Sequence, residues 1–179
     1  MLIRLFFISF VFLACSVKHP SSHILNKNVV ELQGLLLGLS PKVSRDEALN
    51  LSKSSINYSL ELSKKYKAIS SPWIQNALVN IGLKERGLCY EWSEDLLKHL
   101  VKKNYRTLAF HAIGANIGYL NEHNALSVSA KGEGIENSIV LDAWRNSGNL
   151  YFKKLREDKK YRWKERKKVY KEVYMESYH

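Results

Sequence analysis

Apolar residues recur at helical intervals through the first half of the chain, and this pattern predicts three helices. Ser44 and Glu47 have the spacing of a capping box, in which hydroxyl and carboxylate each accept a hydrogen bond from a free amide at a helix start. Pro72 suits the first turn of a later helix, and Gly82 would end that helix. The predicted helices cover residues 29–39, 44–67 and 73–81.

A fourth helical stripe begins at Cys89, and a strand-like alternation follows it. Cys89, Trp92, Leu96 and Leu100 share one helix face, so Cys89 lies at the N-terminal end of the buried stripe. Aromatic and β-branched residues then predict three strands, over residues 105–113, 123–130 and 138–144. The expected fold class is therefore α+β, with N-terminal helices and a central cysteine-bearing helix packed on a small antiparallel sheet.

Positive charge is concentrated at the C-terminal end. The chain has 179 residues, 45% of them hydrophobic and 25% charged, which is usual for a single globular domain. Its net charge is +11, and residues 153–179 contribute +6 of this. Aromatic residues interleave these charges, so we expect a basic C-terminal helix that covers the domain. No nucleic-acid motif accompanies the charge, and anionic lipids or cell-wall polymers are nearer partners.

The first fifteen residues predict export. Arg4 precedes an apolar run from Leu5 to Leu13 that is too short to span a bilayer, as in a signal peptide. The end of this run, Phe-Leu-Ala-Cys15, resembles the lipobox of bacterial lipoproteins, with Phe where Leu is usual. The resemblance implies that residues 1–14 are removed and that Cys15 is acylated, with residues 15–27 forming a polar tether. It implies a lipid-anchored envelope protein, which we expect in the outer membrane. The alternative is an ordinary secretory signal with an incidental cysteine.

Acylation of Cys15 would leave Cys89 as the only thiol of an exported chain. Amides that are unpaired at a helix start stabilise a thiolate, and Gly87 suits a tight turn into such a start. A nucleophilic thiol also needs a neighbouring base and a group that orients the base. The alternatives for Cys89 are a disulfide to another chain, or a buried cysteine that acts as a small hydrophobic residue.

Two polar residues downstream could complete a thiol site. His123 opens the segment HNALSVSA, and Asp142 lies in IVLDAW. If these strands are antiparallel neighbours, both side chains can point toward the helix that carries Cys89. A buried aspartate is costly without a hydrogen-bond donor, and a histidine would supply one. Two alternatives are that His111 replaces His123 as the base, or that Cys89, His111 and His123 bind zinc, although no short ligand pair is present.

The segments GLCYEW, HNALSV and VLDAW together resemble the transglutaminase-like group of papain-like thiol enzymes. In that group a Gly-x-Cys-x-x-Trp/Phe helix start precedes a strand with His and a strand with Asp. The segment DAWRNSGNLYF is similar to bacterial envelope lipoproteins that carry such a domain. The resemblance implies that Cys89 is the nucleophile, His123 the general base and acid, and Asp142 the orienting carboxylate. It covers roughly residues 70–152 of a single domain over residues 28–179, with a helical region (28–86), a catalytic-like core (87–152) and the basic helix (153–179).

Three functions follow as alternatives. The first is an enzyme that hydrolyses or transamidates amide bonds through an acyl-thioester, on a protein, a peptide or the stem peptide of peptidoglycan. The second is a non-catalytic envelope lipoprotein that binds a peptide or partner in the same groove. The third is an adaptor that binds a membrane or cell wall through the basic helix. No cofactor motif is present, so we expect no cofactor.

Aromatic and amide side chains are the remaining candidates near the thiol. Trp92 and Trp144 could wall a substrate groove, although core packing is the simpler explanation for both. The Cys89 backbone amide could supply one oxyanion donor. Candidates for the second donor are the amide side chains of Gln75, Asn76 and Asn80.

Overall fold

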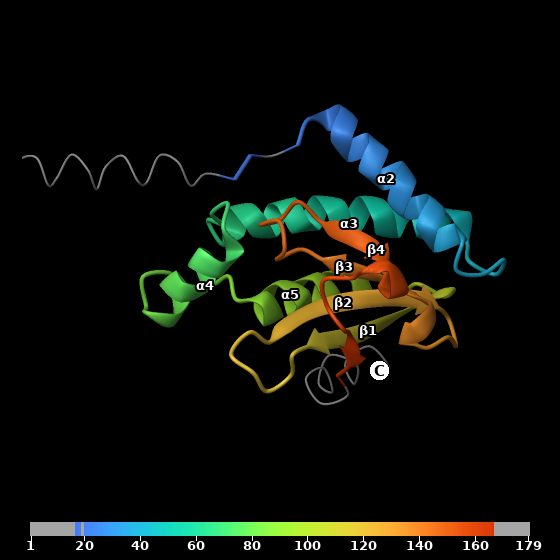
Figure 1. Ribbon diagram of the computed structural model, residues 1–179. Coiled ribbons are helices and arrows are strands. Elements are labelled where there is room, and N and C mark those ends of the chain that lie inside the picture. Colours follow the sequence, from blue (N-terminus) through green and yellow to red (C-terminus); the bar gives the residue numbers. More distant parts are fainter. Residues whose placement is uncertain (1–16, 19, 167–179) are drawn as a thin grey trace, which may run out of the picture.

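The computed structural model describes residues 17–18 and 20–166, and within them four helices precede a five-stranded antiparallel sheet (Figure 1). This arrangement confirms the α+β class, with the helices first and an antiparallel sheet after them. The helices are α2 (Ser22–Leu37), α3 (Arg45–Lys65), α4 (Pro72–Asn80) and α5 (Cys89–Val101). The strands are β1 (Leu108–Ala115), β2 (His123–Ala130), β3 (Ser138–Asp142), β4 (Tyr151–Lys154) and β5 (Lys164–Glu165). Two short 3₁₀ helices, η1 (Ile135–Asn137) and η2 (Leu155–Glu157), connect strands.

The starts of α2 and α3 differ from the predictions in detail. The predicted polar tether over residues 15–27 ends early, because α2 begins at Ser22. At α3 the Ser44 hydroxyl accepts a hydrogen bond from the Glu47 amide at 3.4 Å, as the capping-box spacing predicts. The Glu47 carboxylate does not reach back to complete the box. It accepts hydrogen bonds from the backbone amides of Arg106 and Thr107, at 2.7 and 2.9 Å, and so ties α3 to the chain that leads into β1.

The sheet has the strand order β4-β3-β2-β1-β5 and separates two groups of apolar side chains. Every residue of the central strand β2 is buried. Leu126 lies opposite Leu141 in the register, and both belong to the large core that includes the apolar face of α5. Alternate strand residues point to opposite faces, so Ala125 and Val140 project to the other side, where they pack with Trp163. Each fully buried Leu contributes about 1.5–3 kcal/mol to this packing.

The predicted basic helix over residues 153–179 is wrong over residues 153–166, where the chain forms the end of β4, η2 and β5. Residues 167–179 lie outside the described residues. The physical reason is the second face of the sheet, which α5 does not cover and which needs apolar cover of its own. Trp163 is buried there between exposed Arg162 and Lys164, an alternation that suits an extended segment as well as a helix.

Candidate active site

The start of α5 places the Cys89 thiol beside helix amides that the Glu91 side chain helps to organise. The Glu91 carboxylate accepts hydrogen bonds from the Gly87 and Leu88 amides at 2.7 and 3.0 Å, and so caps the helix. Gly87 has φ +129°, and a Cβ there would lie 2.5 Å from the Nε2 atom of Gln75. Only glycine fits this approach, which explains the residue two positions before the thiol.

His123 and Asp142 form a buried pair at the ends of β2 and β3. The Nε2 atom of His123 lies 2.7 Å from Oδ2 of Asp142, and the two side chains are 0% and 1% exposed. Strand alternation puts both on the face shared with Ala125 and Val140. These strand positions lie on the face opposite to the one that packs against the apolar side of α5. The ring still approaches the thiol, because His123 is the first residue of β2 and lies at the end of the sheet.

The Cys89 side chain is nearly enclosed, since the residue is only 7% exposed. Its sulfur lies 3.7 Å from Nδ2 of Asn124 and 3.9 Å from the carbonyl oxygen of Glu122. The second ring nitrogen of His123, Nδ1, is buried and has no hydrogen-bond partner of regular geometry among the described residues. The His123 ring nevertheless lies close enough to the thiol to lower the pKa of Cys89. Since Nε2 is engaged by Asp142, Nδ1 is the ring atom that can exchange a proton with the thiol.

The pKa values of the three groups shift in directions that favour charge separation. Burial alone would raise the pKa of Cys89, but interactions with His123 and Asn124 outweigh it and lower the pKa below 9.0. Burial alone would lower the pKa of His123, but the Asp142 charge and hydrogen bond raise it to about 9. The pKa of Asp142 is lowered by His123 and Arg145 despite burial. Together these shifts favour a thiolate beside an imidazolium.

A cluster from the C-terminal segment, not foreseen in the sequence, surrounds this pair. The rings of Tyr161 and Trp163 lie 4.6 and 5.4 Å from the His123 ring, between centroids. Arg145 donates to Asp142 at 2.9 Å and to Asp158 at 2.7 Å. Trp163 Nε1 donates to the same Asp158 at 2.9 Å. Arg145 directly follows the VLDAW segment, and this closeness to Asp142 is the one feature of the sequence that pointed to the cluster. The contributions of residues 158–163 depend on tertiary folding.

The alternative histidine and the metal alternative find no support in the geometry. His111 lies on β1, where Nδ1 contacts Glu165 at 3.1 Å and Nε2 contacts Ser129 at 2.8 Å. Neither contact involves Cys89. Within residues 17–18 and 20–166, no group of three His, Cys, Asp or Glu side chains could hold a metal ion.

The predicted amide and groove residues have structural roles. The amide nitrogen of Gln75 donates to the carbonyls of Tyr66 and Arg86, at 3.2 and 3.0 Å. Asn76 accepts from the indole of Trp144 at 3.0 Å, and Asn80 is exposed at the end of α4. The side-chain amide that contacts the thiol is that of Asn124, at 3.7 Å from the sulfur, and the sequence did not single it out.

Trp92 and Trp144 do not wall an open groove, because both are buried in the core. Trp92 donates to the carbonyl of Gly87 at 3.1 Å and so braces the turn before the thiol. The Trp144 ring lies 4.6 Å from that of His123, between centroids, so it forms part of the wall behind the imidazole.

Comparison of the chain with protein-family models, with curated proteins and with solved structures found no match. In the part of the chain that the structure describes, no helix has the length and apolar character needed to cross a membrane. The predicted lipidation site, Cys15, lies outside the described residues and stays a prediction.

Proposed function

We propose that the protein is a transglutaminase-like thiol enzyme of the cell envelope that acts on amide bonds through an acyl-thioester intermediate. The observation that carries the proposal is the buried 2.7 Å contact between His123 and Asp142, next to a thiol at a helix N-terminus. A buried carboxylate that holds one ring nitrogen leaves the other free to serve a nucleophile, which is the logic of a catalytic triad.

The chemistry would proceed in two halves. The Cys89 thiolate attacks the carbonyl carbon of an amide, and the imidazolium of His123 protonates the leaving amine as the thioester forms. Water or a second amine then attacks the thioester, and His123 accepts its proton as the thiolate leaves. Asp142 stabilises the imidazolium throughout. The Cys89 backbone amide and the Asn124 side chain are the proposed donors to the oxyanion, since Asn124 Nδ2 lies 3.7 Å from the sulfur.

A second candidate is a non-catalytic module that keeps this fold and binds a peptide or partner. The observation that favours it is the enclosure of the thiol, with Cys89 only 7% exposed and Trp92 and Trp144 packed in the core. A thiol of this kind would react slowly with small reagents. The two candidates therefore predict different rates for the reaction of Cys89 with an alkylating reagent.

The test is alkylation of the full-length protein with iodoacetamide at pH 7, with Cys89 and Cys15 followed separately by peptide mass spectrometry. If the protein is an enzyme, iodoacetamide should modify Cys89 faster in the folded protein than in the urea-unfolded protein, and His123→Ala should abolish this difference in rate. His99→Ala is the matched control, because His99 bonds to Ser54 far from the thiol.

Acylation provides the second measurement. The active ester p-nitrophenyl acetate should acetylate Cys89, and hydrolysis of the resulting thioester should be slower in His123→Ala than in His99→Ala. Slow alkylation of the folded protein, equal in both histidine variants, together with no acetylation of Cys89, would exclude the enzyme and leave the binding module.

A further inference from the structure

Helix α4 and the residues just after it expose large apolar side chains to solvent. Residues 70–83 contain no charged side chain, and Gln75 is the buried residue of α4. Trp73, Ile74, Ile81 and Leu83 are 48%, 51%, 67% and 71% exposed. Figure 1 shows α4 at one end of the molecule, beyond the end of α3. A contiguous segment with four large exposed apolar residues indicates an interaction surface.

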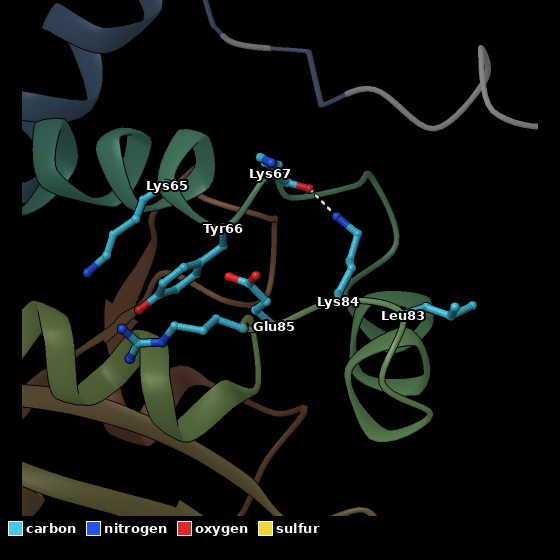
Figure 2. Close-up of a pocket in the computed structure, with 7 residues that line it drawn as sticks. Lys65, Tyr66, Lys67, Leu83, Lys84 and Glu85 are labelled. Carbon is cyan, nitrogen blue, oxygen red and sulfur yellow. Dashed lines mark hydrogen bonds between the residues drawn. The ribbon is translucent and has the colours of Figure 1, made fainter.

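Cationic side chains line a cavity directly beside this apolar surface. The cavity has a volume of about 380 Å³ (Figure 2), and seven residues line it: Lys65, Tyr66, Lys67, Leu83, Lys84, Glu85 and Arg86. Four of the seven are cations and one, Glu85, is an acid. In Figure 2 the Leu83 side chain points away from the cationic side chains, so the cavity and the exposed apolar surface adjoin at this residue.

Two of these cations are available to an anion. Lys65 and Arg86 already pair with Asp95, at 2.8 and 3.6 Å. Lys67 and Lys84 form no ion pair with any residue that the structure describes, and the Lys84 amine donates to the Lys67 carbonyl. Burial and the neighbouring Lys67 charge lower the pKa of Lys84, so a bound anion would relieve an existing repulsion.

The start of the described chain lies at the same end of the molecule. Asn149 donates to the carbonyl of Lys18 at 3.2 Å, and Ser147, two residues before Asn149, donates to the carbonyl of Ile69 at 2.6 Å, just before α4. Cys15 precedes Lys18 by three residues, which span at most about 11 Å when extended. A lipid anchor at Cys15 would therefore hold the end of the molecule that carries α4 close to the membrane.

We propose that α4 and the cationic cavity beside it bind the surface of an anionic phospholipid bilayer. The exposed apolar side chains of α4, together with Ile81 and Leu83 just after it, enter the boundary between head groups and acyl chains, while Lys67 and Lys84 bind head-group phosphates. A Trp among aliphatic residues, flanked by lysines, is the composition that this boundary favours. The inference is independent of the chemistry proposed for Cys89.

The test uses the fluorescence of Trp73, because the other three tryptophans, Trp92, Trp144 and Trp163, are buried. Full-length protein is reconstituted into vesicles of phosphatidylglycerol and phosphatidylcholine in which the phosphatidylcholine carries brominated acyl chains. Bromine quenches an indole only at contact range, so attachment through the N-terminus alone leaves Trp73 bright. We expect quenching in the wild type, loss of that quenched component in Trp73→Phe, and weaker quenching on brominated phosphatidylcholine alone.

A second variant keeps the test independent of the contact between Trp73 and Trp144, whose ring centroids are 5.1 Å apart. Leu83→Ser alters a side chain that is 71% exposed, so the fold should be kept, as near-ultraviolet circular dichroism can verify. Its Trp73 quenching should fall. Equal emission with and without brominated lipid in the wild type would overturn the proposal and would point to a protein partner for α4 instead.

Discussion

Replacing Asp142 by Asn tests whether the carboxylate keeps His123 charged beside the thiol. The asparagine has nearly the same size and can still accept a hydrogen bond from the ring across the 2.7 Å contact. It removes the negative charge, which is the largest influence that raises the pKa of His123. Burial then dominates, and the ring becomes neutral at pH 7.

The expected magnitude follows from the His123 pKa. Its rise from 6.5 to about 9 corresponds to about 3 kcal/mol in favour of the charged ring, or about three-hundredfold in the protonation equilibrium. Without the imidazolium, burial raises the pKa of Cys89 and the thiolate fraction at pH 7 falls. We therefore expect Asp142→Asn to slow alkylation of Cys89 at pH 7 by about ten- to a hundredfold. The dependence of the rate on pH should move to the alkaline side.

The assay is the rate of iodoacetamide modification of Cys89 between pH 5 and 10, in variants shown by circular dichroism to be folded. Asp158→Asn is the matched control, because Asp158 is a second buried aspartate that binds Arg145 without contacting His123. Either variant leaves Arg145 with one fewer carboxylate, so general effects on stability should be similar. A wild-type rate and pH profile in Asp142→Asn would refute the role assigned to this carboxylate.

Three further predictions concern stability, measured as the free energy of unfolding in urea. Burial would raise the pKa of Asp158, but hydrogen bonds from Arg145 and Trp163 lower it below 3.8 in the folded protein. The stability that the Asp158 carboxylate contributes is therefore full above pH 3.8 and is lost as the pH falls through the lower pKa of the folded state. Asp158→Asn should flatten the decline in the free energy of unfolding below about pH 4. Gly87→Ala should cost about 2–4 kcal/mol, because the new methyl group would collide with Gln75. Gly132→Ala, with φ +88° but open space around it, should cost about 1 kcal/mol. Equal costs would contradict the collision with Gln75. Glu91→Ala should cost about 1–2 kcal/mol by uncapping two amides, and Glu94→Ala, at a half-buried side chain that makes one long ion pair with Lys98, should stay within about 0.5 kcal/mol.

The sequence predicted the local elements well because short-range rules govern them. The helix that begins at Cys89 and the strand over residues 123–130 have the predicted positions. Ser44 caps α3 as its spacing indicates, and Pro72 occupies the first turn of α4. Periodicity, capping and turn residues act within a few positions of the chain, so they can be found without knowing the fold.

Partners separated by long stretches of chain could not be predicted in the same way. Alternation groups His123 with Ala125 on β2 and Asp142 with Val140 on β3, but it states neither that the two groups share a face nor which face meets α5. The interleaved charges at residues 153–166 fit a helix or an extended segment, and the uncovered face of the sheet decides between them. Glu47 has the capping-box spacing, yet it bonds to Arg106 and Thr107, which lie 59 and 60 residues away.

By itself, then, the sequence determined the α+β class and the position of Cys89 at a helix start. It also marked His123 and Asp142 as candidates for a hydrogen-bonded pair. Only the tertiary structure decided that this pair lies on the face away from α5, with Arg145, Tyr161 and Trp163 around it. The reason is that a buried charge needs partners from every side, and these come from whichever segments the folded sheet brings into contact.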